Sequence, residues 1–446
     1  MKTIRAGWNT PLLIFPAVLL GWVLLGTGLL LLPGMIVPGG SLTGHQAFLT
    51  AVSATTLTGI RIVTLTDFTL LGQWVLIVLM HAGLWTVLWA AFTMALHPRL
   101  SGHSRAAVAL ATSTGTRSRL LPRIIGITLA IELAGSLLIY GSLGNDNPWT
   151  DAGSGLFFAW FQAVSAFTQT GFTLLEGGMQ HPFIRHHYVL QLLLAALVCL
   201  GAIGFTTMWD SLHPARLRER LHHPERKPYF STRQNINFTV ALVVLGAVWL
   251  FIQERNGAFR DMRFTEAAIS AVFHSATART AGFSTVPVQH WAPGSWMLLL
   301  LLMGIGGAPL SPAGGIKIPA VAALLRPLER LLPVRPRPVP GLQTALVLVG
   351  FFGAAILVGT ALLMLTERTL LEAGFLHWTD LLFRQTAAIT TAGISGNSTA
   401  HFTTGSLNIL AASMLIGRAG PLLIVYYLQV RAARGTVGST HHLWMG

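Results

Sequence analysis

Charged residues are scarce in this sequence. Asp, Glu, Lys and Arg make up only 10% of the 446 residues, and 52% are hydrophobic, whereas soluble domains carry roughly 25% charged residues. Cysteine is almost absent: Cys199 is the only one, which excludes a disulfide within the chain and leaves a thiol inside an apolar run, where packing is its usual role. These shortages exclude a string of ordinary soluble domains and a disulfide-stabilised scaffold.

Clusters of chemically reactive side chains are lacking as well. Glu132 and His81 stand alone in apolar runs, and the histidine pairs do not have the spacing of metal ligands on a helix. The glycine-rich stretch before Lys317 lacks the Gly-Lys-Ser/Thr ending of a phosphate loop. We therefore expect no enzyme. Glu132 is either a coupling site or a protonated or paired carboxyl, and His81 is expected to be packed and hydrogen-bonded.

Long apolar runs are what the sequence does contain. A run of about 20 residues suffices for a helix to cross a membrane, and eight runs come near or exceed this length. The sequence therefore predicts an all-α membrane protein with eight transmembrane helices, the first of them longer than a cleavable signal segment and so retained. The runs are Pro11–Leu32, Leu71–Leu96, Ile124–Leu143, Tyr188–Trp209, Ile236–Ile252, Ser295–Leu325, Thr344–Leu365 and Gly405–Val430.

The net charge of +14 has an uneven distribution. Basic residues cluster between the second and third runs, the fourth and fifth, and the sixth and seventh, and in both tails, which all lie on one side if the spans alternate. The positive-inside rule makes that side cytoplasmic, so we expect a multi-pass protein of the cytoplasmic (inner) membrane with both termini inside. The arginines are then expected to contact anionic membrane lipid rather than nucleic acid.

Four glycines recur at nearly constant intervals. Gly59, Gly171, Gly282 and Gly393 are separated by 112, 111 and 111 residues, and each is followed by Ile or Phe. A short apolar segment, too short to cross a membrane, precedes each of them. The pattern predicts four parallel repeats of span, pore helix and span, arranged pseudo-fourfold around a central pore. Their expected ranges are 1–97, 98–212, 213–335 and 336–446.

The loops at these glycines have the chemistry of a cation filter. A re-entrant half-helix directs the partial negative charge of its C-terminal end toward the pore axis. The extended residues that follow have carbonyls without helical partners, which must face water or an ion, as in potassium filters. The predicted ion-binding residues are Thr56, Leu57, Thr58, Gly59, Thr168, Gln169, Thr170, Gly171, Arg279, Thr280, Ala281, Gly282, Thr390, Thr391, Ala392 and Gly393.

The sixth run is broken in the middle. Residues 304–315 include five glycines and two prolines, which cannot hold a continuous helix, so we expect a flexible segment under the filter. Arg418, in the middle of the last span, either contacts carbonyls of this segment as part of a gate or forms a structural pair between helices. Lys317 either takes part in gating or extends toward the cytoplasm. The predicted gate residues are Gly306, Gly307, Ser311, Gly314, Gly315, Lys317 and Arg418.

Three stretches resemble the Trk/Ktr/HKT superfamily of potassium transporters, and the resemblance extends over nearly the whole chain. They are Thr277–Phe283, Met303–Lys317 and Gly417–Leu422. The resemblance implies potassium uptake through a filter at the four glycines, a homodimer with one pore in each chain, and a cytoplasmic nucleotide-binding regulatory ring. Eight spans look more like the Ktr type, and glycine rather than serine at position 59 favours potassium. A secondary carrier, or a sodium-permeable transporter of the same fold, is the alternative, and coupling to Na⁺ or H⁺ stays open.

The chain also departs from the family pattern. The family usually has Gly where Leu310 stands and Thr where Pro312 stands, so a stiffer segment and different gating are expected. Gln169 and Arg384 also replace the family's usual residues, which leaves fine selectivity open. For Arg279 and Arg384 we consider external acids such as Glu372 or Asp380 as partners.

Overall fold

A computed structural model describes residues 6–95, 120–144, 148–149, 151–212, 214–223, 230–287, 290–329, 341–394 and 402–435. Within these ranges the chain is helical, with two isolated β-bridges and no strand. Most of the arginine cluster predicted between the second and third runs, including Arg99, Arg105 and Arg117, lies outside the described residues.

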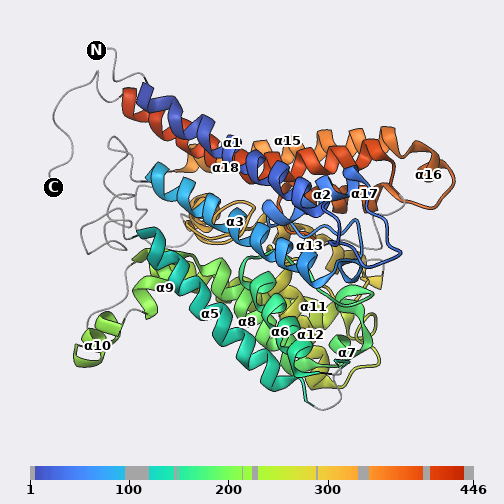
Figure 1. The fold of residues 1–446 in the computed structure, drawn as a ribbon. Coiled ribbons are helices and arrows are strands. Elements are labelled where there is room, and N and C mark those ends of the chain that lie inside the picture. The colour runs from blue at the N-terminus through green and yellow to red at the C-terminus, as the bar shows by residue number, and fades with distance from the viewer. Residues whose placement is uncertain are drawn as a thin grey trace.

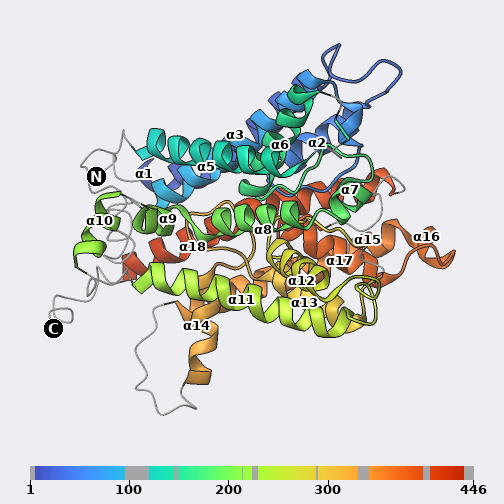
Figure 2. The same ribbon diagram turned by 90° about the horizontal axis from the view of Figure 1, so that it is seen from below.

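Among the described residues, six helices are long and apolar enough to cross a membrane. In α1, α11 and α15 only 28% of the apolar window is buried inside the protein, so most of the surface of these helices is left for lipid. Figures 1 and 2 show the long helices running broadly along one direction of the molecule. They are α1 (Ala6–Leu30), α3 (Leu70–Ala95), α5 (Leu120–Ser142), α11 (Phe230–Glu254), α15 (Leu342–Thr366) and α18 (Thr404–Gly435).

Four shorter helices occupy the predicted short apolar segments. Their last turns are buried, and their first turns are stabilised by side chains that accept backbone N–H groups: Thr43 accepts from Gln46 at 3.2 Å and Asp151 accepts from Ser154 at 2.8 Å. These helices are α2 (Gly44–Thr55), α6 (Ala152–Phe167), α12 (Phe264–Ala278) and α17 (Trp378–Ile389).

Contacts among the helices repeat four times along the chain. Each short helix packs against the helices of the predicted spans before and after it: α2 against α1 and α3, α6 against α5 and α8 (Tyr188–Ile203), α12 against α11 and α13 (Pro293–Gly304), and α17 against α15 and α18. Each also packs against the helix that starts the second predicted span of the preceding quarter: α6 on α3, α12 on α8, α17 on α13, and α2 on α18. Because α18 comes back to α2, these contacts close into a ring.

Two of the predicted spans are not straight helices. The sixth is divided into α13 and α14 (Ile318–Glu329) by the glycine-rich residues, as predicted. The fourth was predicted to be continuous, and this is wrong: α8 and α9 (Phe205–Leu212) meet at an angle of 105°. Gly204 has φ +88° at the bend, and a Cβ there would lie 2.5 Å from the carbonyl oxygen of Pro309. Against the eight predicted spans, of which the sixth was expected to be broken, the described residues contain six uninterrupted helices of spanning length, or up to seven if α8 and α9 count as one span.

Polar contacts join the end of the first predicted span to the start of the second in each quarter. In the first two quarters a side chain from the second span binds a carbonyl at the end of the first. In the last two quarters a buried carboxylate at the end of the first span accepts a backbone N–H from the start of the second. The pairs are Thr69 Oγ1 to Gly34 O (2.6 Å), His187 Nε2 to Ser142 O (2.8 Å), Ala292 N to Glu254 Oε1 (2.8 Å) and Thr403 N to Glu367 Oε1 (2.7 Å).

The remaining elements are short connectors. They are η2 (Leu65–Asp67), η4 (Gly178–Gln180), α7 (Pro182–Arg185), α10 (Pro214–His222) and α16 (Arg368–Glu372). Helix α10, the start of α1 and the end of α18 lie at one end of the molecule, and α7 and α16 lie toward the other (Figure 1).

Candidate functional site

The four glycine loops begin where the short helices end. Thr56, Thr168, Arg279 and Thr390 are the C-cap residues of α2, α6, α12 and α17. Of the sixteen predicted ion-binding residues, fourteen are buried, and Gly171 and Gly282 are partly exposed. The structure therefore places all sixteen in the interior, at the C-terminal ends of four converging helices.

The four glycines lie in a closed ring. A Cβ added to Gly59 would overlap the carbonyl oxygen of Thr170, one on Gly171 would overlap that of Ala281, and one on Gly282 would lie 2.5 Å from that of Ala392. A Cβ on Gly393 would overlap the carbonyl oxygen of Thr58, which returns to the first loop. All four glycines have positive φ, between 66° and 82°. Only glycine combines this conformation with such close approach to a neighbouring backbone.

Backbone N–H groups in these loops turn back toward their own helices. Thr58 N donates to Ser53 O at 3.0 Å, Thr170 N to Ser165 O at 2.9 Å, and Ala392 N to Ala387 O at 2.9 Å. Within the described parts of the chain, no N–H group donates to the carbonyl oxygens of residues 56–59, 168–171, 279–282 or 390–393. Buried carbonyl groups without a donor are costly, so they require water or a cation as a partner.

Hydroxyl groups hold the far side of three of the loops. Ser53 Oγ donates to Ile60 O at 2.9 Å, Ser165 Oγ to Phe172 O at 2.7 Å, and Thr277 Oγ1 to Phe283 O at 2.8 Å. Sequence reasoning singled out the threonines nearer the glycines and missed Ser53 and Ser165. A hydroxyl six residues before the glycine was the available signal, in the first two loops only.

The third loop follows a different backbone path. Leu57, Gln169 and Thr391, each two residues before the glycine, have φ between 51° and 67°, whereas Thr280 in the third loop is not among the residues with positive φ. There the N–H groups of Thr280, Ala281 and Gly282 all donate to Thr277 O. Its anchoring hydroxyl on Thr277 stands five residues before the glycine rather than six.

Arg279 and Gln169 connect this loop to other parts of the protein. The Arg279 side chain is 1% exposed, and its Nη2 donates to Gly306 O at 3.0 Å. Gln169 Oε1 accepts from Thr280 Oγ1, and Gln169 Nε2 donates to Val198 O at 2.7 Å. Gln169 therefore bridges the second loop, the third loop and α8.

The proposed pairing of Arg279 with an external acid is wrong, because its guanidinium reaches Gly306 O inside the protein. Glu372 forms an exposed ion pair with Arg368 at 2.6 Å. Arg384 lies near the carboxylates of Asp380 and Glu367, as expected for Asp380, and over the ring of Phe402 at 4.4 Å.

The segment between α13 and α14 lies against the fourth loop. A Cβ on Gly314 would overlap Thr390 O and Thr391 Oγ1, and one on Gly306 would overlap Gly314 O. The two ends of the segment meet in an isolated parallel bridge between Ile305 and Ile316. The segment is thus folded back on itself and packed against the fourth glycine loop.

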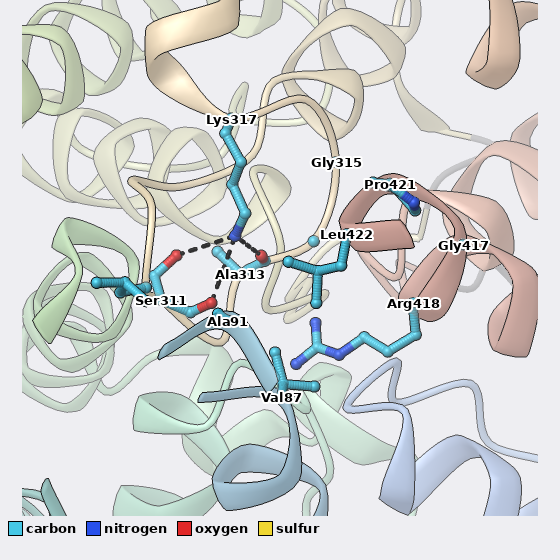
Figure 3. Close-up of a pocket in the computed structure, with 12 residues that line it drawn as sticks. Val87, Ala91, Ser311, Ala313, Gly315, Lys317, Gly417, Arg418, Pro421 and Leu422 are labelled. Carbon is cyan, nitrogen blue, oxygen red and sulfur yellow. Dashed lines mark hydrogen bonds between the residues drawn. The ribbon is translucent and has the colours of Figure 1, made fainter. Parts of the chain in front are cut away.

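Two cationic side chains bind residues 311–313 of this segment, and Figure 3 shows both side chains together with the hydrogen bonds of Lys317. Lys317 Nζ donates to Ala313 O at 2.6 Å and to the carbonyl and hydroxyl oxygens of Ser311 at 3.3 Å, so it turns into the segment rather than away from it. Arg418 Nη1 donates to Pro312 O at 2.5 Å, which is the type of partner predicted for it. Both side chains line a cavity of about 40 Å³ with Ser311, Gly314 and Gly315.

His81 and Glu132 form a buried pair away from the loops. His81 Nε2 and Glu132 Oε2 are 2.9 Å apart, between α3 and α5, and His81 Nδ1 lies 3.0 Å from Ile77 O. The contact favours the paired interpretation of Glu132. Among the described residues, no group of three His, Cys, Asp or Glu side chains could hold a metal ion.

Comparisons with known proteins agree with one another. A family model described as "TrkH: Cation transport protein" matches residues 41–430. The chain is 29% identical to the Ktr system potassium uptake protein B of Vibrio alginolyticus over 426 residues, which is 92% of this chain and 89% of that protein. It is 28% identical to the protein of the same name from Bacillus subtilis over 424 residues, covering 91% and 89%. It is 25% identical to the potassium/sodium uptake protein NtpJ of Enterococcus hirae over 427 residues, covering 92% and 91%.

A solved structure shows the fold. The crystal structure of the potassium transporter TrkH from Vibrio parahaemolyticus superimposes with a TM-score of 0.62 at 20% identity, covering 93% of this chain and 84% of that one.

Proposed function

The chain belongs to the TrkH family of cation transport proteins, and on that premise we propose that it takes up potassium through a filter of backbone carbonyls at Gly59, Gly171, Gly282 and Gly393. Members of this family are transporters rather than enzymes, and the six long apolar helices agree with a multi-pass membrane protein. Relatives whose names specify potassium uptake, 27 to 29% identical over at least 90% of this chain, support potassium as the ion.

One observation carries this proposal. Each of the four glycines approaches a carbonyl oxygen of the next loop, and among the residues that the structure describes no N–H group donates to the buried carbonyls of these loops. Rings of carbonyl oxygens can replace the hydration shell of a potassium ion. The C-terminal ends of α2, α6, α12 and α17 add partial negative charge at the same place.

The fourfold arrangement belongs to the same proposal. We assign one repeat of span, pore helix and span to each of the ranges 1–97, 98–212, 213–335 and 336–446. The closed ring of helix contacts from α2 to α18 supports this division. In the second and third repeats the second span is interrupted, at Gly204 and between α13 and α14.

The segment at residues 304–317 is the proposed gate. It lies against the fourth loop, and it carries Lys317 and contacts Arg418. Two positive charges close to the ion path raise the energy of a permeating cation strongly where water is sparse. Movement of the segment away from the path would lower this barrier and admit ions.

The proposal extends to partners and to orientation in the membrane. We propose a homodimer with one pore in each chain, a cytoplasmic nucleotide-binding regulatory ring, and basic loops and both termini at the cytoplasmic side of the inner membrane, against anionic lipid.

Coupling to Na⁺ or H⁺ is not assigned. A sodium-permeable transporter of the same fold is the second candidate, since one relative is named a potassium/sodium uptake protein.

Rubidium uptake into liposomes that contain the purified protein tests the proposal. Excess potassium should abolish uptake, and sodium should compete much less well. Uptake that is indifferent to potassium would refute the filter, and equal competition by sodium would favour the second candidate.

A further inference from the structure

We propose that Arg279 is a positioning residue that couples the segment at residues 304–317 to the third filter loop, so that gate movement changes ion discrimination as well as flux. This inference rests on the proposed function. It assigns to Arg279 a role different from that of an ion ligand.

Arg279 has few alternatives to its present contact. Its side chain is 1% exposed, its one hydrogen bond is to Gly306 O at 3.0 Å, and its Nε has no partner within the described chain. A buried guanidinium that loses its acceptor is left uncompensated, which is costly. Displacement of Gly306 therefore either breaks this bond at a substantial cost or moves Arg279 with it.

Gly306 lies at the point where the two ends of the segment meet. Gly306 N donates to Ile316 O at 3.0 Å, and Ile316 N donates to Gly304 O at 2.9 Å. A Cβ at Gly306 would overlap Gly314 O, so the return limb of the segment packs directly on this residue. A shift of the return limb is therefore transmitted to the carbonyl that Arg279 holds.

Two different sets of contacts hold the rest of the segment: backbone bonds hold residues 308–310, and cationic side chains hold residues 311–313. Ala308 N donates to Ala202 O at 2.8 Å and Phe205 N donates to Leu310 O at 2.9 Å, which binds residues 308–310 to the bend between α8 and α9. Residues 311–313 are held by Lys317 and Arg418. Release of the Arg418 contact would therefore free residues 311–313 first, while Gly306 stays hydrogen-bonded to the third loop through Arg279 and Gly314 stays packed on the fourth.

The third loop transmits such a shift onward. Arg279 directly precedes Thr280, Ala281 and Gly282, whose N–H groups share one acceptor, Thr277 O. Thr280 Oγ1 in turn donates to Gln169 in the second loop. Movement of Arg279 thus alters the carbonyl positions of one loop directly and of its neighbour through one hydrogen bond.

The test is a double-mutant cycle in liposomes, with rubidium uptake competed by potassium or sodium. Discrimination is measured as the sodium concentration that halves rubidium uptake divided by the potassium concentration that does so. Arg418→Gln should raise flux and change this ratio. Arg279→Gln should reduce that ratio by about tenfold, the effect of losing one buried hydrogen bond from a charged group. In the double variant, Arg418→Gln should still raise flux but should leave the ratio unchanged.

Two further variants make the test specific. Arg279→Lys keeps the charge and one donor, so it should restore part of the dependence of the ratio on Arg418. Arg384→Gln is the matched control, because Arg384 is also a buried arginine on a pore helix, 6% exposed, but lies near Asp380 and Glu367. In that background Arg418→Gln should change the ratio as it does in the parent protein.

A thermal-stability measurement, which does not depend on ion flux, separates folding defects from effects on ion binding. The melting temperature of the detergent-solubilised protein is followed at increasing concentrations of potassium or sodium. In Arg279→Gln, the potassium concentration that gives half of the maximal stabilisation should rise more than the corresponding sodium concentration. If Arg279→Gln lowers only the yield of folded protein, and the ratio still responds fully to Arg418→Gln, Arg279 is a structural anchor and the inference is overturned. If the parent protein shows no rubidium uptake that potassium competes, the proposed function itself fails.

Discussion

The third glycine loop and the other three loops differ in how the residue at the end of the short helix is held. Three residues before the glycine, the other loops have Thr56, Thr168 and Thr390, whose hydroxyls bond back to carbonyls of their own helices. The third loop has Arg279 at this position, and its side chain leaves the loop to reach Gly306 O. The threonines thus bond within their own helices, whereas Arg279 bonds to the segment at residues 304–317.

The backbone differs together with the side chain. The first, second and fourth loops each place a non-glycine residue in the left-handed region, at Leu57, Gln169 and Thr391. The first two loops have a serine six residues before the glycine, and the third loop lacks it. This difference does not explain why the third loop has no left-handed residue, because the fourth loop has Ala387 at that position and keeps Thr391 in the left-handed region. The comparison indicates that four loops can share their placement in a ring while the third differs in backbone path and binds the segment at residues 304–317 through a side chain.

The largest effect is expected at the feature that all four loops share. Gly171→Ser adds a side chain where a Cβ would overlap Ala281 O, so potassium discrimination over sodium should fall by about tenfold or more. Gly177→Ser is the matched control: its φ is +75° but no atom lies within 4 Å of an added Cβ. Competition of rubidium uptake measures both, and equal discrimination in Gly171→Ser would place Gly171 outside the filter.

The next largest effect is expected at Thr390, which occupies in the fourth loop the position that Arg279 occupies in the third. Thr390→Val removes a buried hydroxyl that donates to Thr386 O at 2.6 Å. The loss should cost about 1–3 kcal/mol in the free energy that stabilises the fourth loop. Thr27→Val removes a similar bond, to Val23 O at 2.8 Å, in the lipid-facing helix α1. We expect Thr390→Val to weaken potassium over sodium competition and Thr27→Val to leave it unchanged. Identical competition curves for the two variants would contradict a filter role for Thr390.

A smaller effect is expected in the gate segment. Leu310 has φ +56°, which costs a residue with a side chain about 1–2 kcal/mol, a strain that glycine avoids. Leu310→Gly combined with Pro312→Thr should loosen the segment and raise the uptake rate severalfold, with a change in sodium and potassium competition in the same direction as in Arg418→Gln. The single variants separate the two contributions, and unchanged uptake kinetics in the double variant would count against the gate assignment.

The smallest effect is expected at the exposed start of α6. The backbone N–H and hydroxyl of Ser154 hold the pKa of the Asp151 carboxyl below its ordinary value of 3.8. A depressed pKa stabilises the folded state above the unfolded value, and this contribution disappears as pH falls through the folded pKa. Asp151→Asn should therefore lower the melting temperature slightly at neutral pH and not in acid. Glu266→Gln, which affects the capping of α12 through Arg263 N, allows comparison with the third pore helix.

Much of the architecture follows from local patterns. Apolar runs predict the long helices, because lipid requires every backbone polar group to be satisfied within the segment. The interval between glycines predicts the four loops, and the glycines and prolines at 304–315 predict the break between α13 and α14. The bend at Gly204 could not be predicted, since a single glycine in an apolar run is compatible with a continuous helix.

Sequence by itself determined that the chain crosses a membrane several times and that four glycine-hinged loops recur along it, because composition and spacing are local properties of the chain. Tertiary structure decided that the glycines close into a ring, that Arg279 turns inward to Gly306 rather than outward to an acid, and that Lys317 turns into its own segment. The partner of a buried charge depends on which carbonyls the fold leaves within reach, and residues far apart in sequence supply them.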